Sequence, residues 1–533
     1  MFARRIGHCA GGCALRSSRH SLPGRFRLVQ RQFASQASQA AAPAQIPVAA
    51  SSPLGALTVE LDQIAPRFEV PACQITILDS PALFYQTLKD KILNAQRRVY
   101  LSTLYIGNAE HELVATIDTA LQTNPDLKVS ILTDALRGTR ESPNPSCASL
   151  LADLVRKHGE RVEIRMFHTP NFKGLKKKVV PKRINEGWGL QHMKLYGVDD
   201  EIILSGANLS NDYFTNRVDR YHVFSSKQLA DYYDKIHQSV CSLSFQVLPD
   251  SNPAGYILTW PNAAPCPLTE TKAFKSHSAA VLKPLIQPAQ PAPKTSLRDG
   301  STFVYPISQF TPLIGQHEST EYPAVTSILT SLAESPQLHN SKWIFTAGYF
   351  NMHPTVSSLL ISSAPPSSPT SNRCTVLTAS PWANGFFGSK GISGMLPAAY
   401  THLATKFLNR VAAAGRKDTV ELKEWRRGTV GQPNGWTYHA KGLWVTLPKE
   451  ENPSLTIVGS SNYTKRSYNL DIEVGAVVVT SDEKLRRRLG EETRWLQQYA
   501  TTTTKKDLET GERKAGWHVR LAMRIVEMVG GAL

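Results

Sequence analysis

Two short segments, far apart in this chain, carry similar sets of chemically active side chains. The first segment contributes His192, Lys194, Asp199, Ser205 and Asn208. The second begins 247 residues later and contributes His439, Lys441, Ser460 and Asn462. In each copy an apolar run, at residues 202–204 and 455–458, separates the His-x-Lys pair from a turn of small residues that ends at the asparagine. We interpret the two segments as two halves of one site.

The residue types indicate chemistry at a phosphate. Residues i and i+2 of a strand point to one face, so each histidine shares a face with the lysine that follows it. One neutral imidazole can attack phosphorus, and a second, protonated imidazole can give its proton to the departing oxygen. The charge on the nonbridging oxygens would be stabilised by Lys194, Lys441, Asn208, Asn462, Ser205 and Ser460. This composition favours a phosphate over a carbonyl substrate.

A single His-x-Lys pair is also an ordinary pattern of an exposed strand, with no function attached to it. Here two pairs occur, and each is followed at a similar distance by an apolar strand and a Gly/Ser-x-Asn turn. Such a repetition favours the functional interpretation.

The pattern His-x-Lys-x4-Asp, followed by a small-residue turn and Asn, resembles that of the phospholipase D superfamily, whose members join two such halves around one site. Within that superfamily the chain is similar to the eukaryotic mitochondrial phosphatidylglycerophosphate synthases. The segments that carry this similarity are GLQHMKLYGVDD, SGANLSNDYFTNRVDRY, ASPWANGFFGSKGISGMLPAAY, YHAKGLW and GSSNYTKRS. The resemblance implies an internally duplicated α/β fold of the phospholipase D type, with two lobes that share one active site at their interface.

The resemblance also implies the reaction. A phosphatidyl group would pass from CDP-diacylglycerol to sn-glycerol 3-phosphate, giving phosphatidylglycerophosphate and CMP on the route to phosphatidylglycerol and cardiolipin. The paired histidines predict two displacements through a phosphohistidine. We assign His192 as the nucleophile, because Asp199 can orient it, and His439 as the general acid and then base. The reverse assignment stays open.

Two positions near the second copy need separate interpretation. Thr446 stands where the superfamily pattern has Asp, so only His192 is expected to have the motif carboxylate as its partner. Arg466 is expected to bind the phosphate of the acceptor, since a guanidinium matches phosphate oxygens in bidentate fashion. A structural ion pair of Arg466 with Asp471 or Glu473 is the competing explanation.

Other functions are compatible with the same residues. Within the superfamily the acceptor can instead be water, as in a phospholipase D or a nuclease, or phosphatidylglycerol, as in a cardiolipin synthase. From a different class comes a catalytically inactive nucleic-acid-binding protein, suggested by the net charge of +17 and by Thr446. Its binding would fall steeply with salt. We expect no nucleic-acid partner, and no metal or other cofactor, because cationic side chains stand where a metal enzyme carries clustered carboxylates. The oligomeric state is not determined.

The first residues have the composition of a mitochondrial transit peptide. The first 59 residues contain seven arginines and no lysine, and the first carboxylate is Glu60. Cleavage after Phe33 is expected, with Arg31 as the basic residue of the site. A disordered basic arm is the alternative. We expect a protein at the matrix face of the inner membrane. No window of 18 uncharged apolar residues exists, so contact with anionic membrane is expected to be peripheral.

Composition is that of a globular protein, with 41% hydrophobic and 19% charged residues. There are seven cysteines. The five beyond residue 33 lie far apart, with no C-x-x-C pair and no cluster of metal-ligand spacing. We predict free thiols in a reducing compartment.

The pattern of elements predicts an α/β fold made of two similar halves. Strands are expected at residues 74–78, 98–105, 127–133 and 162–167, and helices at residues 80–95, 110–122 and 148–158. Residues 341–349, 373–379 and 420–425 repeat the strand order of the first half. The expected parts are a transit peptide (1–33), a linker (34–68), an N-terminal lobe (69–275), a Pro-rich joint (276–300), a C-terminal lobe (301–500) and a helical tail (501–533).

Three further segments have a functional and a plain structural interpretation. Residues 172–183 are lysine-rich and could hold a pyrophosphate or anionic headgroups, or form a solvated loop. Residues 382–394 are glycine-rich and are interpreted, by resemblance, as a loop near the substrate, although a plain mobile loop is the alternative. Residues 517–529 could form an interfacial helix, with Trp517, Leu521, Ile525 and Met528 on one face, or a helix docked on the core.

Overall fold

The structure is a computed structural model that describes residues 52–523, except residues 175–176, 178, 181, 183–184, 290–296, 316, 367–372, 511–512, 514, 517–518 and 521–522. The predicted transit peptide lies outside the described residues. Within the described part of the chain, no helix combines the length and the apolar character needed to cross a membrane. The chain from Pro47 onward forms one compact unit.

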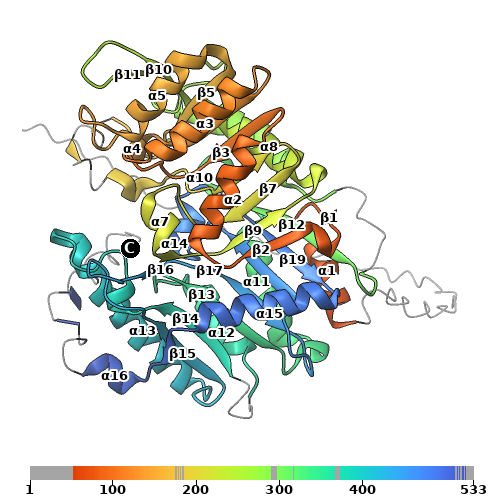
Figure 1. Cartoon of the computed structure of the whole chain (residues 1–533). Coiled ribbons are helices and arrows are strands. Elements are labelled where there is room, and N and C mark those ends of the chain that lie inside the picture. The colour runs from red at the N-terminus through yellow and green to blue at the C-terminus, as the bar shows by residue number, and fades with distance from the viewer. Residues whose placement is uncertain are drawn as a thin grey trace, which may run out of the picture. The chain divides into compact units, whose positions relative to one another are not determined.

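Two nine-stranded sheets form the framework (Figure 1). The first sheet has the spatial order β11 (Tyr256–Thr259), β10 (Phe245–Pro249), β5 (Val162–Phe167), β4 (Lys128–Asp134), β3 (Arg98–Ser102), β6 (Leu195–Val198), β7 (Glu201–Ser205), β9 (Tyr221–Phe224) and β2 (Ile75–Leu78). The second has the order β20 (Ala500–Thr502), β15 (Val420–Trp425), β14 (Cys374–Ala379), β13 (Lys342–Ala347), β17 (Lys441–Thr446), β18 (Leu455–Gly459), β19 (Glu473–Thr480), β12 (Thr302–Gln309) and β1 (Phe68–Glu69).

The strand orders of the two sheets correspond one to one. The run from β10 to β2 in the first sheet matches the run from β20 to β12 in the second. In both sheets three parallel strands, β3-β4-β5 and β13-β14-β15, are followed by an antiparallel pair that carries the His-x-Lys segment at its start. The predicted α/β class with an internal duplication is therefore confirmed.

Helices cover the sheets (Figure 1). The helices of the first half are α2 (Pro81–Leu93), α3 (His111–Thr123), α4 (Ala135–Gly138), α5 (Cys147–His158), α7 (Asn211–Thr215), α8 (Lys227–Cys241) and α9 (Thr271–Ile286). Those packed in the second half are α1 (Pro53–Leu61), α10 (Thr311–Ile314), α11 (Glu321–Glu334), α12 (Pro354–Ser363), α13 (Leu396–Ala413), α14 (Lys465–Asn469), α15 (Glu483–Gln497) and α16 (Lys505–Glu509). Short 3-10 turns are η2 (Ala72–Gln74), η3 (Gly159–Arg161), η4 (Asn185–Trp188), η5 (Pro336–Leu338), η6 (Pro381–Ala383) and η7 (Gly391–Met395).

Local sequence explains why these elements form where they do. In α2, Ser80 caps the helix by accepting a hydrogen bond from the amide of Leu83, and a proline stands in the first turn. Its residues Phe84, Leu88 and Ile92 recur every four positions and are buried as one stripe. The parallel strand β14 is buried at every position, as expected of a strand covered on both faces.

Several predictions about segment boundaries need correction. Residues 53–61, assigned to the linker, form α1, whose buried leucines pack in the core of the second half. Residue 68, the last of the predicted linker, and residue 69, the first of the predicted N-terminal lobe, form β1, which pairs with β12 of the second half. The expected joint at residues 276–300 is helical up to Ile286, with Pro284 inside α9. The first residues that the structure describes therefore belong to the second half.

The predicted C-terminal helical tail is described only in part. Ala515, Val519 and Met523 pack against Ala399 of α13. This packing favours a segment docked on the protein. The apolar face predicted at residues 517, 521, 525 and 528 lies outside the described residues. All five described cysteines are free thiols, as predicted.

A buried ionic network joins the two halves. Arg220, which follows β8 (Arg217–Val218), donates to both carboxylate oxygens of Glu492 in α15, at 2.8 and 3.0 Å. Its guanidinium also donates to the carbonyl of Lys441 and lies 3.9 Å from the ring centroid of Trp444. A buried ion pair is stable when hydrogen bonds satisfy both of its partners, and the contacts of Arg220 and Glu492 meet this condition. Because Arg220 comes from the first half and its partners from the second, the network fixes the halves relative to each other.

Candidate active site

The two His-x-Lys segments meet where the halves contact each other. The amide of His192 donates to the carbonyl of Ile472 in the second half, at 2.9 Å. The amide of His439 donates to the carbonyl of Val218 in the first half, at 2.8 Å. A two-stranded parallel sheet of β8 and β16 (Thr437–Tyr438) crosses the interface beside the second contact. Each histidine is thus held by the other half of the molecule.

Each imidazole binds a carboxylate that also comes from the opposite half. Nδ1 of His192 lies 2.9 Å from Oε2 of Glu473, in β19. Nδ1 of His439 lies 2.7 Å from Oδ2 of Asp219, in the first half. A carboxylate on Nδ1 places the proton on that nitrogen and leaves Nε2 for chemistry. Both carboxylates are buried, whereas His192 and His439 remain 8% and 5% exposed.

The prediction that Asp199 orients His192 is wrong. Asp199 lies in the turn between β6 and β7, with a φ of 50°, and its carboxylate accepts hydrogen bonds from the amides of Gln96, Arg97 and Arg98. An extended chain advances about 3.3 Å per residue, so seven residues place the motif aspartate about 23 Å from the histidine. The carboxylate fixes the start of β3 instead.

The same geometry corrects the interpretation of Thr446. This residue ends β17, at the opposite end of the strand from Lys441. Its replacement of an aspartate therefore leaves the surroundings of His439 unaffected. The motif carboxylate, predicted to be the partner of His192 alone, contacts neither histidine, and each histidine has a different carboxylate as its partner.

The lysines of the motifs point into the same buried region as the histidines. Nζ of Lys194 donates to the carbonyl of His192 at 2.8 Å, and Nζ of Lys441 to the carbonyl of His439 at 3.0 Å. Burial lowers the pKa of Lys194 well below its usual range, while nearby Glu473 raises it. Burial likewise lowers the pKa of Lys441, which lies 3.5 Å from Asp219. An arriving phosphate would favour the charged form of both lysines, since opposite charges stabilise each other.

Burial lowers the pKa of both histidines well below the usual range, and the adjacent lysine lowers each one further. Lys441 also lowers the pKa of His192, although the two residues belong to different halves. The four groups therefore share one electrostatic environment, as predicted for a single site. A low pKa keeps an imidazole neutral, the state that a nucleophile requires.

The two carboxylates differ in charge state. Burial raises the pKa of Glu473 to about 7, partly offset by Lys194 and by a hydrogen bond from Ser460. Burial would also raise the pKa of Asp219, but Lys441 and His439 hold it below its usual range. Asp219 therefore stays ionised and favours the protonated form of His439, whereas Glu473 gives weaker support to a protonated His192.

The small-residue turns place the predicted substrate-binding residues around the histidines, with differing contacts. Ser205 donates to the carbonyl of Arg220, and Ser460 to Glu473, so both hydroxyls are used within the protein. Asn208 donates through Nδ2 to the hydroxyl of Tyr213, at 3.2 Å. The side-chain oxygens of Asn208 and Asn462 have no recorded partner among the described residues. The two asparagines are thus the turn residues that retain free hydrogen-bonding capacity.

Arg466 forms the ion pair that was weighed as its alternative role. Its Nε lies 3.1 Å from Asp471, and Nη2 donates to the carbonyl of Glu186. Asp471 also accepts from the amide of Leu190, two residues before His192. Arg466 therefore helps to position the first motif, and binding of an acceptor phosphate by it stays a prediction.

Two of the segments singled out in the sequence adjoin the site. Phe386, in the glycine-rich loop, contacts Tyr349 with ring centroids 5.4 Å apart, and Tyr349 contacts His439 at 5.3 Å. Val180, in the lysine-rich segment, packs on an apolar cluster that contains Leu190. Of that segment's charged residues, Lys173, Lys177 and Lys182 are described.

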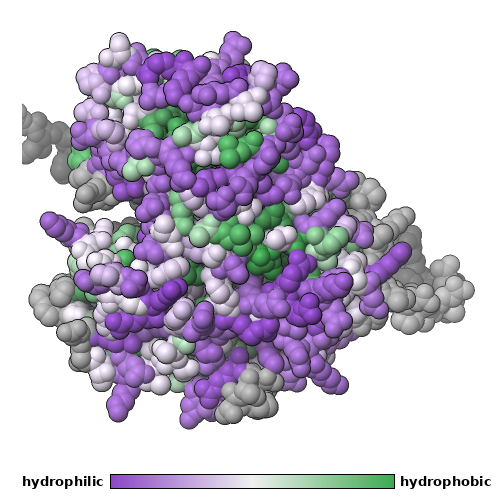
Figure 2. Space-filling view, viewed as in Figure 1, coloured by the Kyte–Doolittle hydropathy of each residue, from purple (hydrophilic) through white to green (hydrophobic). Residues whose placement is uncertain are grey.

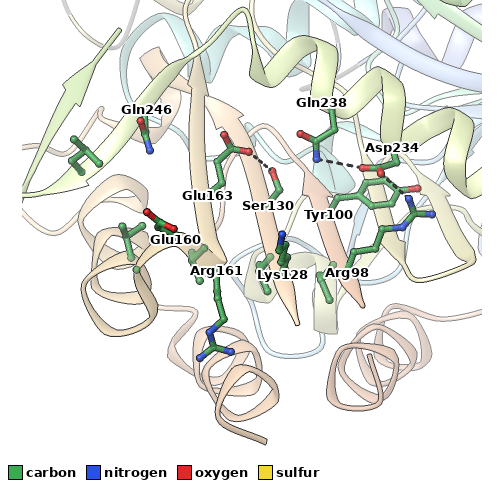
Figure 3. Close-up of a pocket in the computed structure, with 16 residues that line it drawn as sticks. Arg98, Tyr100, Lys128, Ser130, Glu160, Arg161, Glu163, Asp234, Gln238 and Gln246 are labelled. Atoms are coloured by element: carbon green, nitrogen blue, oxygen red, sulfur yellow. Dashed lines mark hydrogen bonds and ion pairs between the residues drawn. The ribbon is translucent and has the colours of Figure 1, made fainter. Parts of the chain in front are cut away.

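A separate cavity of about 620 Å³ lies at the other end of the first sheet (Figure 3). It is bordered by the residues that begin β3, β4 and β5, and its polar groups pair among themselves. Arg98 binds Asp234 at 2.7 Å, and Ser130 donates to Glu163 at 3.3 Å. The histidines lie beyond the opposite ends of these strands, because Leu195 pairs with Ser102, the last residue of β3. This cavity is therefore distinct from the candidate site.

Sequence reasoning missed the carboxylates of Asp219 and Glu473 as partners of the histidines. A signal for them was present. Asp219 follows Asn208 by 11 residues, and Glu473 follows Asn462 by the same number. That equal spacing identifies them as equivalent positions of the two halves. It could not indicate that each serves the histidine of the other half.

Comparisons with known proteins identify the family of the chain and relatives of its fold. The chain is 43% identical over 499 residues to the CDP-diacylglycerol--glycerol-3-phosphate 3-phosphatidyltransferase of Saccharomyces cerevisiae, covering 90% of this chain and 94% of the yeast protein. It is 33% identical over 492 residues to the mitochondrial human protein of the same name, covering 87% and 84%. Among solved structures, the phosphatidylserine synthase of Haemophilus influenzae has a TM-score of 0.66 at 19% identity, covering 89% of this chain and 97% of that one. No family model matches the chain.

Proposed function

The chain belongs to the family of CDP-diacylglycerol--glycerol-3-phosphate 3-phosphatidyltransferases, and from this premise we propose that it transfers a phosphatidyl group from CDP-diacylglycerol to sn-glycerol 3-phosphate. The products are phosphatidylglycerophosphate and CMP, and the reaction serves the synthesis of phosphatidylglycerol and cardiolipin. The observation that carries the proposal is a pair of buried imidazoles, each with a carboxylate on Nδ1 and a motif lysine beside it.

The first chemical step uses both histidines. Nε2 of His192 attacks the phosphorus that carries diacylglycerol, and a nitrogen–phosphorus bond forms as the bond to the CMP oxygen breaks. The protonated form of His439 is favoured by ionised Asp219 and by the negative charge of the bound donor, which oppose the effect of burial. His439 gives its Nε2 proton to CMP as CMP leaves. Lys194 and Lys441 stabilise the charge that develops on the nonbridging oxygens.

The second step reverses the proton transfer. Nε2 of His439, now neutral, takes the proton of the glycerol 3-phosphate hydroxyl, whose oxygen attacks phosphorus. The nitrogen–phosphorus bond breaks, His192 returns to its neutral form and His439 is again protonated. Every proton and bond is thus restored after one turnover.

The carboxylates support the proposed assignment of the two roles. Ionised Asp219 stabilises a protonated His439, which suits a general acid. The pKa of Glu473, raised to about 7 by burial, leaves His192 neutral, which suits a nucleophile.

Product analysis of purified protein tests the proposed function. Protein lacking residues 1–33 is incubated in detergent micelles with CDP-diacylglycerol and EDTA, with and without glycerol 3-phosphate. We expect CMP release and phosphatidylglycerophosphate to depend on the acceptor and to persist in EDTA. Equal consumption of the donor without the acceptor would instead identify a hydrolase, and a product formed from phosphatidylglycerol would identify a cardiolipin synthase.

We further propose that the protein works in mitochondria, at the matrix face of the inner membrane, in peripheral contact with anionic lipid. Two exposed apolar side chains lie close to the site. Val179, 70% exposed, stands among the exposed lysines Lys173, Lys177 and Lys182, and Phe387, 38% exposed, stands in the glycine-rich loop. Lysines near an anionic surface each contribute about 1 kcal/mol, and an apolar side chain inserted beside them adds to that attraction. Contact at these loops would bring the lipid donor to the histidines.

Vesicle flotation checks the membrane contact. The double variant Val179→Asp, Phe387→Asp is expected to reduce binding to vesicles that contain phosphatidylglycerol by at least about 10-fold, because two apolar side chains lose their burial in lipid. Ile257→Asp is the matched control, since Ile257 in β11 is 39% exposed and remote from the site. Equal binding of the double variant and the control would exclude these loops as the contact.

A further inference from the structure

Tyr213, the third residue of α7, binds the reactive nitrogen of only one of the two histidines. Its hydroxyl lies 3.3 Å from Nε2 of His439, and its ring meets the imidazole edge to face with centroids 5.2 Å apart. Nδ1 of the same imidazole is held by Asp219. Nζ of Lys441 also lies 3.3 Å from Nε2. The orientation of His439 is therefore fixed at both ring nitrogens.

The hydroxyl of Tyr213 is itself fixed. Asn208, the asparagine of the first turn, donates to it through Nδ2. The guanidinium of Arg217 lies 4.5 Å from the centroid of the tyrosine ring and is held by Asp212 at 2.7 Å. The tyrosine is buried. A side chain with these contacts presents its hydroxyl at one position, which is what a positioning group requires.

The other half has no tyrosine at this place. α14 follows Asn462 as α7 follows Asn208, and its third residue is Ser467. The hydroxyl of Ser467 pairs with Thr464, at 3.2 Å. No hydrogen bond to Nε2 of His192 is recorded from any side chain in the part of the chain that the structure describes. The two halves therefore differ in the side chains that contact Nε2 of their histidine, the nitrogen proposed to react.

From this difference we propose that Tyr213 is a positioning residue, which holds Nε2 of His439 for proton transfer. The inference rests on the proposed function and deepens it. A tyrosine hydroxyl donates to a bare imidazole nitrogen and accepts from a protonated one, so Tyr213 can keep its contact through both states of His439. His192, with Nε2 unoccupied by the described side chains, is left to attack phosphorus.

His439 can exchange its Nε2 proton with the substrates while Tyr213 stays in contact with Nε2. When CMP leaves, the single proton on Nε2 of His439, shared until then between the Tyr213 oxygen and the CMP oxygen, moves to the CMP oxygen. The Tyr213 hydroxyl then turns to donate to the bare nitrogen. When the acceptor hydroxyl gives up its proton to Nε2, the Tyr213 oxygen accepts from it again. Tyr213 gains and loses no proton in either step.

Removal of this one hydroxyl tests the proposal. In Tyr213→Phe, kcat is expected to fall about 10- to 100-fold, the range for a lost hydrogen bond to a charged group. KM for CDP-diacylglycerol is expected to change by less than about 3-fold, because Tyr213 is proposed to act on His439 and not on the substrate. A charge-assisted bond to the tyrosine oxygen stabilises protonated His439. Its loss lowers the pKa of that histidine, so the alkaline limb of the kcat profile moves to lower pH.

The matched control is Tyr100→Phe, which removes another buried hydroxyl. Tyr100 is labelled in Figure 3, and its hydroxyl donates to the carbonyl of Ala230. The control is expected to keep the kcat and pH profile of the parent protein. Thermal unfolding of both variants identifies any general loss of stability. An unchanged pH profile in Tyr213→Phe, or a phosphoenzyme carried by His439 in the parent protein, overturns the inference. A parent protein that forms no acceptor-dependent product overturns the proposed function itself.

Discussion

Replacing either catalytic histidine by alanine is expected to lower the rate of phosphatidyl transfer by about 10⁴-fold or more. Without His192 no nitrogen is available to attack phosphorus. Without His439 neither CMP nor the acceptor hydroxyl can exchange a proton with the protein. The measurement is phosphatidylglycerophosphate formed per active molecule, with exposed His277→Ala in α9 as the control that keeps the parent activity.

The two alanine variants are expected to fail at different points. With donor labelled at the phosphatidyl phosphorus and the reaction stopped in alkali, His439→Ala should retain label on His192, because CMP can depart slowly without a proton while the acceptor stays unactivated. His192→Ala should carry no label. Label found on His439 in the His192→Ala protein would reverse the assignment of roles.

The second large effect is expected at the carboxylates that cross between the halves. Glu473→Gln and Asp219→Asn should each lower kcat about 10³- to 10⁴-fold, as in other sites where an amide replaces the carboxylate on a catalytic imidazole. The amide group can donate to Nδ1, which moves the imidazole proton to Nε2 and blocks that nitrogen. Both substitutions conserve shape, so the substrate KM and the thermal unfolding midpoint should change little.

Asp199→Asn is the control for these carboxylates. This substitution removes the charge of the motif aspartate, whose carboxylate oxygens accept hydrogen bonds from backbone amides at the start of β3. We expect the thermal unfolding midpoint to fall. We expect kcat to stay within about 3-fold of that of the parent protein. A loss of kcat in Asp199→Asn as large as in Glu473→Gln would contradict the exchange of partners seen in the structure.

The pKa of Glu473 gives this site a pH dependence with a defined sign. The carboxylate must be ionised to accept the Nδ1 proton of His192, and burial raises its pKa to about 7. The rate should therefore rise as pH increases through about 7 and fall below it. In Glu473→Gln the residual rate should lose this acidic limb, which a pH profile of kcat/KM for the donor would show.

Local sequence was sufficient for the framework of this protein. Apolar periodicity and caps predicted α2, α3 and α5 and the strands β3, β4 and β5, because those elements bury stripes encoded within a few residues. The repeated histidine, lysine and asparagine predicted two halves and one phosphate site. The family resemblance extended these residues to a reaction.

The sequence failed where contacts join segments distant along the chain. The composition of residues 53–61 predicts a linker. The residues that they pack against lie in the core of the second half, far along the chain, so local sequence gives no sign of this packing. Asp199 stands beside His192 in the motif, yet the extended strand between them carries it to the far end of the sheet.

Only the tertiary structure decided that each histidine contacts a carboxylate of the opposite half. Glu473 serves His192, Asp219 serves His439, and Tyr213 distinguishes one imidazole from the other. Each of these contacts spans more than 200 residues. Side-chain types and spacing determine which groups a chain possesses, but packing of the two halves determines which group meets which. The different roles that we propose for the two histidines therefore depend on contacts that only the fold provides.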